Sequence, residues 1–433
     1  MNKLLKIEKA LFYFLALAFF WQIRLVWPGA SQQFNEWGSF FVYATDIIIV
    51  AILILWLARS GKKLSAQNIF NGTNIALAVF LFFCALSILA GQDKSVAFFR
   101  SAKLLEMAGL YFYIRYNFSA LYNFKRFWQW FLLGAALQSV VAIAQFLTQK
   151  SLGLKIFAES PLAASIDGVA KIVVGGEKIV RAYGLVPHPN ILAAILVAAI
   201  FGLAWLFLEQ KKTRLKTVLF SAAFLLLGAA LFFTFSRSVI IIGGGLFLIW
   251  LVSFWWKNKE YRQPIIFICI FLFVISCSLL ILYWPYVASR YGIAALPGSQ
   301  SIDLRAFYNQ QALKMAWQKP ILGVGQGNFT MALRDNISLP DWQYQPAHNI
   351  YLLAAAENGL GALLAFLVFL FLTVRSVWSS KKELLASCLL VVISCLLLIS
   401  CFDHFLWDLQ QGQILFWLMI GLLASTSLRS SAD

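Results

Sequence analysis

Long apolar runs, separated by short polar segments, recur along almost the whole chain of 433 residues. A helix needs about 20 mostly apolar residues to cross the hydrocarbon core of a bilayer. We therefore predict an all-α, polytopic membrane protein in which residues 1–433 form a single membrane domain of about twelve transmembrane helices. The predicted helices are residues 9–27, 38–58, 73–91, 96–115, 127–148, 189–208, 217–235, 238–256, 264–285, 349–373, 384–402 and 408–427.

The fourth predicted helix, 96–115, is the least apolar, because Arg100, Lys103 and Glu106 interrupt it. Their spacing of three residues places them on one helical face, so we expect a polar stripe that faces the interior of the bundle.

The first apolar run follows a basic N-terminus, but no small-residue cleavage site closes it. We therefore expect a retained first helix rather than a cleaved signal peptide.

Lysine and arginine mark every second short loop, which sets the expected orientation. Cytoplasmic loops are enriched in these residues, so we predict that both termini are cytoplasmic. The loop at 28–37, with no Lys or Arg, would then lie outside, as would two long loops at 149–188 and 286–348. Residues 304–317 of the second long loop predict an amphipathic helix at the membrane interface. The basic loops contain Arg59, Lys62, Lys63, Arg115, Lys125, Arg126, Lys211, Lys212, Arg214, Lys216, Lys257, Lys259, Arg262, Arg375, Lys381 and Lys382.

Composition agrees with a membrane protein, since 61% of the residues are hydrophobic and only 12% are charged. Soluble domains carry about 25% charged residues. The net charge of +17 would suit nucleic acid, but no basic segment lies away from a membrane flank, so we expect membrane lipids as partners and no nucleic acid. The six cysteines all fall in apolar segments without a CxxC motif, so we expect neither disulfides nor a metal cluster.

The candidate chemistry gathers at the predicted outer ends of the helices. The chain has three histidines, His188, His348 and His404, and each lies at such an end. Histidine is suited to acid–base chemistry near neutral pH, although a single interfacial histidine is more often a polar anchor. Three arginines share this side, because Arg181 precedes the sixth helix, Arg237 occupies the turn between helices seven and eight, and Arg305 opens the amphipathic segment. They are candidates to bind an anion, with snorkelling to lipid headgroups as the alternative.

The sequence around His348 contains further candidate residues. Tyr351 follows it by one helical turn, and Glu357 would be a buried carboxylate that needs a partner. Asp403 and His404 form a charge-capable pair, or alternatively a helix-end cap. Upstream, the glycine-rich segment 323–329 lacks the preceding strand and the Lys-Ser/Thr ending of a phosphate loop. We therefore expect a turn in which the backbone approaches a neighbour or a substrate.

These segments resemble the O-antigen ligase/polymerase superfamily of bacterial envelope proteins. The similarity covers roughly the C-terminal 60% of the chain, in the order that the superfamily shows. The matching segments are Arg181 to Asn190 with its His-Pro-Asn ending, Ser236-Arg237-Ser238, Gly323 to Phe329, His348-Asn-x-Tyr-Leu352 with Glu357-x-Gly359, and Asp403-His404 followed by Gln411-Gly412 and Trp417.

The resemblance implies a helical bundle in the bacterial inner membrane, with a large periplasmic loop that corresponds to residues 286–348, between the ninth and tenth helices. It also implies transfer of a glycan from an undecaprenyl-pyrophosphate carrier to an acceptor hydroxyl, such as that of a lipid A core, at a site facing the periplasm. The chain carries no HExxH motif, no paired Asp motif and no Gly-x-Ser-x-Gly elbow. We expect no metal and no cofactor.

Residues and resemblance together suggest a mechanism. Arg237 and Arg305, followed by Arg181, would bind the pyrophosphate and stabilise the charge that develops as it leaves. His348 would be the base, kept neutral by its position at a helix N-terminus, and direct attack at the anomeric carbon would invert its configuration. Residues expected to support the site are Glu357, His188, Tyr351, Asp403 and His404.

Two alternatives stay open. A polymerase of the same superfamily would join repeat units, with a glycan in place of the lipid acceptor, and some relatives attach glycans to protein. A transporter of small anions is a different class, which predicts polar residues near the bilayer midplane and an internal repeat. The sequence has no convincing duplication between its halves, and its polar residues crowd the helix ends.

Overall fold

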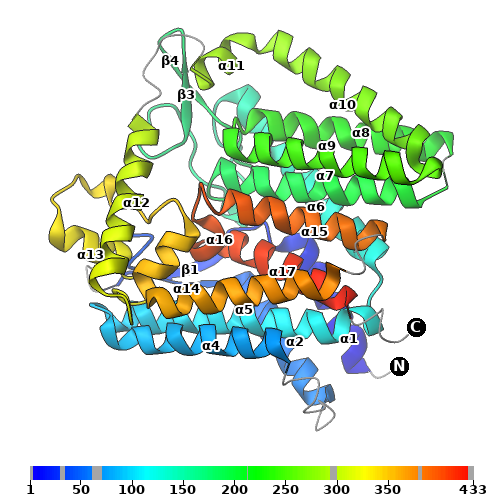
Figure 1. Cartoon of the computed structure of the whole chain (residues 1–433). Helices are drawn as coiled ribbons and strands as arrows, with labels where there is room; N and C mark the ends of the chain where they lie inside the picture. Colours follow the sequence, from blue (N-terminus) through cyan, green and yellow to red (C-terminus); the bar gives the residue numbers. More distant parts are fainter. Residues whose placement is uncertain are drawn as a thin grey trace.

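Each of the twelve predicted segments contains a helix of the bundle in Figure 1, a computed structural model that describes residues 3–29, 35–60, 71–211, 213–292, 300–378 and 383–427. The predicted lysines 62, 63, 212, 381 and 382 lie outside the described residues. The helices are α1 (Lys3–Ala18), α2 (Ala44–Ser60), α4 (Gly72–Ser87), α5 (Lys94–Leu121), α6 (Phe124–Thr148), α7 (Pro189–Glu209), α8 (Arg214–Phe233), α9 (Arg237–Lys257), α10 (Arg262–Leu282), α14 (Ile350–Val377), α15 (Leu384–Ile399) and α17 (Gln410–Thr426).

Seven segments of the described chain are long and apolar enough to cross a membrane, while α15 is apolar but shorter. The helical, polytopic architecture is therefore confirmed, and the number of twelve spans stays a prediction. The seven segments are Gly72–Ala90, Phe124–Thr148, Pro189–Glu209, Arg214–Phe233, Arg237–Lys257, Lys259–Leu282 and Ile350–Val377.

Two small hairpins depart from the all-α prediction. The helix predicted at 9–27 ends at Ala18, and β1 (Arg24–Trp27) pairs antiparallel with β2 (Phe40–Tyr43), where the helix of 38–58 was expected to begin. The side chain of Arg24 forms an ion pair with Glu36 at 2.7 Å and donates to the Tyr43 hydroxyl at 2.8 Å. The hairpin therefore gives the guanidinium of Arg24 a carboxylate and a hydroxyl as partners. A helix that continued through lipid would leave this charge without them.

The second hairpin joins β3 (Lys171–Val174) to β4 (Glu177–Val180). Its turn is Gly175-Gly176, and both glycines have positive φ, at 59° and 90°. A turn with positive φ at both positions favours glycine. Hairpins use such turns because the twist of the turn matches that of the strands. The signal was present in the sequence, as two β-branched runs separated by two glycines.

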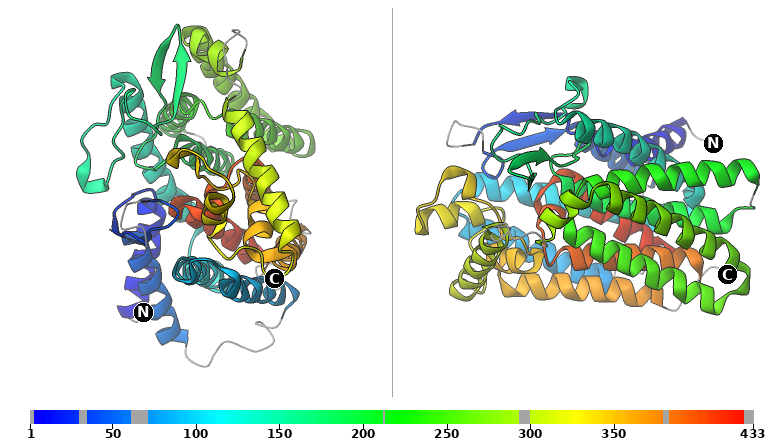
Figure 2. Two further views of the ribbon diagram at one scale, coloured as in Figure 1. Left: turned by 90° about the vertical axis from the view of Figure 1, so that its left-hand side faces the viewer. Right: turned by 90° about the horizontal axis from the view of Figure 1, so that it is seen from above.

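Helix α7 is surrounded by other helices and is buried along its whole length from Pro189 to Leu208. A helix that is apolar on every side is stable only where it is surrounded by other helices. It packs against α6, α8, α9 and α15, while α5 packs along α17 and α4 along α14 (Figures 1 and 2). All six cysteines are free thiols within this helical frame.

The predicted polar stripe on the fourth segment does face the bundle. Lys103 of α5 is buried and forms an ion pair with Asp46 of α2, which also accepts a hydrogen bond from Gln410 of α17. Arg100 donates to the backbone oxygens of Glu36 and Asp408, at 3.0 Å and 3.1 Å. These contacts connect α2, α5 and α17 below the outer loops.

The polar loops gather at one end of the bundle. There lie both hairpins, α11 (Trp284–Arg290), α12 (Gln300–Gln318), α13 (Phe329–Asn336) and α16 (Phe405–Asp408), whereas α1 begins and α17 ends at the opposite end (Figures 1 and 2). The amphipathic segment predicted at 304–317 is part of α12. One side of it packs against α14, with Tyr308 and Ala312 buried, whereas Leu313 and Trp317 are exposed; its place at the membrane interface stays a prediction.

Helix α14 is interrupted at Gly359, whose φ of 85° and ψ of 169° are not helical. The glycine-rich loop satisfies the backbone groups that this break frees. Val324 and Gly325 donate their N–H groups to the carbonyls of Ala356 and Glu357 at 2.8 Å and 2.9 Å, and Leu360 donates to Pro320 at 2.8 Å. The expectation that this loop approaches a neighbour through its backbone is confirmed, and the neighbour is the broken helix.

Candidate functional site

A buried hydrogen-bond network begins at Asn190, the second residue of α7. Its side-chain oxygen accepts from Arg181 at 2.8 Å and from Ser236 at 2.9 Å, and its side-chain nitrogen donates to Asp403 at 2.6 Å. All four side chains are buried. Asn190 therefore joins the segment after β4, the turn between α8 and α9, and the segment before α16.

Arg181 stabilises the turn between α8 and α9. It follows β4 directly, and its Nε donates to the carbonyl of Thr234, just beyond the end of α8, at 2.6 Å. A cation at a helix C-terminus is stabilised by the free carbonyl groups there and by the helix dipole. Burial, together with nearby Arg290 and Arg305, lowers the pKa of Arg181 to about 9. Because its guanidinium is already bonded to Thr234 and Asn190, Arg181 fixes the position of its neighbour Arg237.

Two histidine rings from distant segments lie against each other. His348 precedes α14 and His404 precedes α16, and their ring centroids are 4.9 Å apart with the planes perpendicular. Tyr308 of α12 stacks on His348 at 5.9 Å, and Trp37 contacts the ring of His404 at 5.4 Å. Nδ1 of His348 is buried without a hydrogen-bond partner.

The pKa of His348 is lowered to about 3, in the direction that the sequence predicts. The causes are burial first, and then the positive charges of His404 and Arg305. Asn349, rather than His348, is the cap of α14, where its side chain accepts from the backbone N–H groups of Tyr351 and Leu352. A neutral imidazole is the form that a general base needs.

His188 caps α7, since its Nδ1 accepts from the backbone N–H of Asn190 at 3.2 Å. Burial and the positive charge of Arg181 lower its pKa to about 3. Asp403 is held in its charged form, whereas His188 is held neutral. Although burial raises the pKa of a carboxyl, the neighbouring His404, His348 and Arg305 hold that of Asp403 below its usual range. Asp403 is therefore the anion of this cluster.

Three further arginines surround the cluster without a carboxylate partner in the part of the chain that the structure describes. Arg237 donates to the backbone oxygen of Arg290 at 3.3 Å, and Arg290 donates to that of Phe235 at 3.1 Å. Burial, with Arg237 and Arg305, lowers the pKa of Arg290 to about 10. Burial is the largest cause, and the repulsion from Arg237 and Arg305 adds to it; a bound anion would offset that repulsion.

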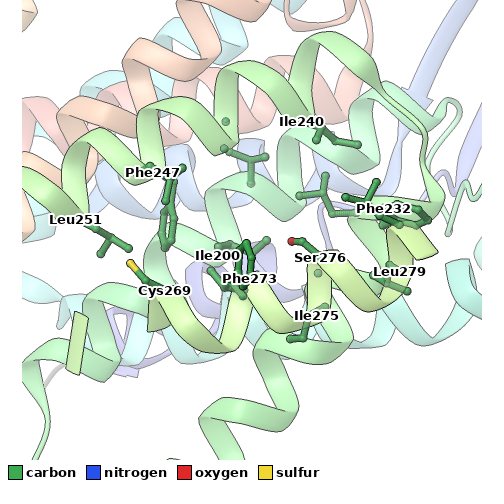
Figure 3. Close-up of a pocket in the computed structure, with 18 of the residues that line it drawn as sticks. Ile200, Phe232, Ile240, Phe247, Leu251, Cys269, Phe273, Ile275, Ser276 and Leu279 are labelled. Atoms are coloured by element: carbon green, nitrogen blue, oxygen red, sulfur yellow. The ribbon is translucent and has the colours of Figure 1, made fainter. Parts of the chain in front are cut away.

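An apolar cavity of about 900 Å³ lies between α7, α8, α9 and α10 (Figure 3). Figure 3 shows Phe232, Phe247, Phe273 and Leu279 among the side chains around it. Val287 and Tyr291, which flank Arg290, also line it. The lining also includes Phe235, and so the chain that forms this part of the apolar cavity continues directly into Arg237 and Arg290.

Glu357 is buried on α14, two residues before the break. The indole N–H of Trp407 donates to it at 3.0 Å, so the expected partner of this carboxylate is a tryptophan of α16. Tyr351 lies elsewhere, because its hydroxyl donates to the carbonyl of Leu397 on α15 at 2.8 Å. Tyr351 therefore joins α14 to α15, and its contacts do not include the histidines.

The structure thus brings seven of the nine predicted site residues to one end of the bundle, whereas Glu357 bonds to Trp407 and Tyr351 to α15. Sequence reasoning missed Arg290 and Asp408, which stand in none of the motifs. For Asp408, the spacing of four from His404 was an available signal. No group of three or more His, Cys, Asp or Glu side chains in the described part is arranged to hold a metal ion.

Residues 222–367 match the family model described as O-antigen ligase. The matched region runs from α8 to α14 and includes Arg237, Arg290, Arg305, His348 and Glu357. The match confirms the resemblance to the O-antigen ligase/polymerase superfamily. No curated protein matches the chain significantly.

Proposed function

From the match to the O-antigen ligase family, we propose that this protein transfers a glycan from undecaprenyl pyrophosphate to an acceptor hydroxyl, as a ligase in the bacterial inner membrane whose site faces the periplasm. The observation that carries the proposal is the group of mutually repelling arginines Arg237, Arg290 and Arg305, two of which are close in sequence to the lining of the apolar cavity. A polyprenyl pyrophosphate has the matching chemistry, with an apolar chain that ends in a concentrated negative charge.

The arginines suit the pyrophosphate at both stages of the reaction. Guanidinium groups form charge-assisted hydrogen bonds with phosphate oxygens, and their charge stabilises the leaving group. Arg237 is held by the turn that Arg181 fixes, so it is preorganised before the donor binds. Part of the polyprenyl chain would occupy the cavity of about 900 Å³.

His348 is the proposed general base. The acceptor oxygen forms a bond to the anomeric carbon as the bond from that carbon to the pyrophosphate oxygen breaks, and the acceptor proton moves to the imidazole of His348. The configuration at the carbon inverts. In the protein without a bound donor, His348 has a pKa of about 3, which burial causes first and the positive charge of Arg305 lowers further. An anionic donor bound near Arg305 would raise that pKa and make His348 a stronger base when the substrate is in place.

The test is transfer by the purified protein from an undecaprenyl-pyrophosphate-linked glycan, with a chelator present. Arg237→Ala and Arg305→Ala should raise the KM for the donor about tenfold or more. His348→Ala should lower kcat by about 10²–10⁴. The matched control is Arg334→Ala, because Arg334 forms an exposed ion pair with Asp341 in the same long loop. Full activity in the three site variants would refute the site, and a strict need for metal would refute the mechanism.

The acceptor distinguishes the two members of the superfamily. Offering a lipid A core and, separately, a second carrier-linked repeat unit separates the reactions by product. Capped lipid A supports a ligase, whereas a lengthened carrier-linked glycan supports a polymerase. In a knockout, the corresponding outcomes are the loss of capped lipid A or the appearance of single-repeat products.

A further inference from the structure

His404 has the carboxylate partner that His348 lacks. Its Nδ1 lies 2.9 Å from both side-chain oxygens of Asp408, and its backbone N–H donates to Asp403 at 2.9 Å. Both members of the His404–Asp408 pair are nearly buried, with side-chain exposures of 9% and 11%. A histidine whose Nδ1 is held by a buried carboxylate is oriented in the way that catalytic bases commonly are, and the ring of His404 lies 4.9 Å from that of His348, centroid to centroid.

The surrounding chain keeps this pair rigid. Arg100 of α5 donates to the backbone oxygen of Asp408 at 3.1 Å, and Trp37 packs against the His404 ring. Gly412 at the start of α17 lies so close to Phe405 that a Cβ there would meet its carbonyl oxygen at 2.1 Å. The segment Phe405–Asp408 is therefore fixed between α5 and α17, and the imidazole of His404 is fixed with it.

We propose that His404, oriented by Asp408, is a second acid–base residue of this site, which takes up the acceptor's proton from His348. The inference rests on the proposed glycan transfer. In this step the acceptor's O–H bond breaks, its proton moves to His348, and His348 passes the same proton to neutral His404. The resulting imidazolium is paired with the Asp408 carboxylate and later releases the proton to water.

The electrostatics favour this direction of proton movement. Burial lowers the pKa of His404, but Asp408 and then Asp403 outweigh it, so the pKa of His404 is raised, whereas that of His348 is lowered. Two neighbouring groups whose pKa values are pushed apart in this way commonly divide acid and base roles. The charged and titratable groups around His404 are Asp403, Asp408, His348, His188, Arg305 and Arg100.

The test is the pH dependence of kcat/KM for transfer by Asp408→Asn in the full-length protein. Without the carboxylate the imidazolium of His404 loses its partner. The acidic limb of the kcat/KM profile, which reports the pKa of the base, should therefore move to lower pH by about one unit. In addition, kcat at pH 7 should fall about 10–100-fold. The KM for the donor should stay within about twofold of the wild-type value, because the arginines are untouched. Asp408→Glu should recover part of the rate.

The control is Asp341→Asn, which removes an exposed carboxylate of the long loop. A profile of Asp408→Asn that superimposes on that of the wild type, in protein with an unchanged melting temperature, would overturn the proposal. If Asp408→Asn does not fold, His404→Gln is measured in the same way, and wild-type kcat in that variant has the same meaning. Absence of transfer by the wild type itself would instead refute the proposed function.

Discussion

Asn190 positions three segments of the chain through one side chain, which accepts from Arg181 and Ser236 and donates to Asp403. None of these groups reaches water, so each depends on the others for its hydrogen bonds. Removing one member would leave the remaining groups buried without partners, which costs more than the hydrogen bond itself contributes.

Replacing Asn190 with leucine should therefore destabilise the protein by about 3 kcal/mol, since Arg181, Ser236 and Asp403 all lose a buried partner. Thermal unfolding in detergent measures the effect. Asn336→Leu is the control, because the Asn336 side chain is exposed at the end of α13. Equal melting temperatures for the two variants would contradict the structural role of Asn190.

The pH dependence of stability follows from His188 and His348, whose pKa values are both lowered to about 3. In the unfolded chain both would titrate near 6.5. Between these values the unfolded state binds more protons, so the stability contributed by the two histidines is present above about pH 6.5 and is lost as the pH falls toward 3. The melting temperature should drop less steeply from pH 7 to pH 4 in the double variant His188→Gln/His348→Gln. A slope identical to that of the wild type would disprove this.

Which site residues are predictable depends on how they reach the site. Arg237, His348 and His404 stand at helix ends or in motifs, so hydropathy and resemblance find them together. Arg290 stands in no motif, and Trp37 reaches His404 only through tertiary packing from the N-terminal region. Their positions depend on contacts between segments that are 55 residues apart for Arg290 and Phe235, and much further apart for Trp37 and His404, which no local pattern encodes.

At the scale of elements, the break in α14 depends on a glycine at each contact. A Cβ on Gly359 would meet the carbonyl oxygen of Ile321 at 2.2 Å, and one on Gly323 would meet the carbonyl of Glu357 at 2.4 Å. Both residues also have positive φ. The loop and the helix therefore approach as backbone against backbone, in a conformation that essentially only glycine adopts.

Gly359→Ala should cost at least about 3 kcal/mol, because it adds a steric clash to a backbone conformation that alanine avoids. Gly245→Ala in α9 is the matched control. A Cβ there meets nothing within 4 Å, and alanine favours a helix more than glycine does, so this variant should be neutral or slightly stabilising. Comparable yields and melting temperatures of the two variants would contradict the role of the break.

The elements themselves were predictable to different extents. Apolar runs located all twelve helices, because length and hydropathy are strong signals for a buried or lipid-facing helix. The run at 9–27 was wrong beyond Ala18, because hydropathy alone does not distinguish a membrane helix from a short apolar strand with a paired arginine. The break at Gly359 was not predictable, since one glycine in an apolar helix is common and its partner lies about 35 residues away.

At the scale of the whole molecule, the two hairpins and the short helices α11, α12, α13 and α16 lie at one end of the bundle, whereas α1 begins and α17 ends at the other (Figure 2). The outer end collects the arginines, the histidines and the long loop, whereas Lys125, Glu209, Asn258 and Glu383 line one polar cavity elsewhere. That cavity joins the α5–α6 turn to the ends of α7, α9 and α15. From the positive-inside rule we predict that this side is cytoplasmic.

Cysteine labelling tests this orientation. In a variant without the six native cysteines, Asp335→Cys in α13 and Glu260→Cys in the link between α9 and α10 each introduce one exposed thiol. A membrane-impermeant maleimide should label Asp335→Cys in intact spheroplasts, and Glu260→Cys only after permeabilisation, because we place these positions on opposite sides. The reverse pattern would invert the orientation and move the proposed site to the cytoplasm.

The contact between the glycine-rich loop and α14 also limits how the protein can be recombined. The N–H groups of Val324 and Gly325 complete a membrane helix that begins some 25 residues later in the chain. A chimera that takes its long loop from a relative would supply foreign donors to this helix if the junction fell between Pro320 and Gly359. Loop and broken helix therefore form one module, and a chimera that folds needs its junctions outside that interval.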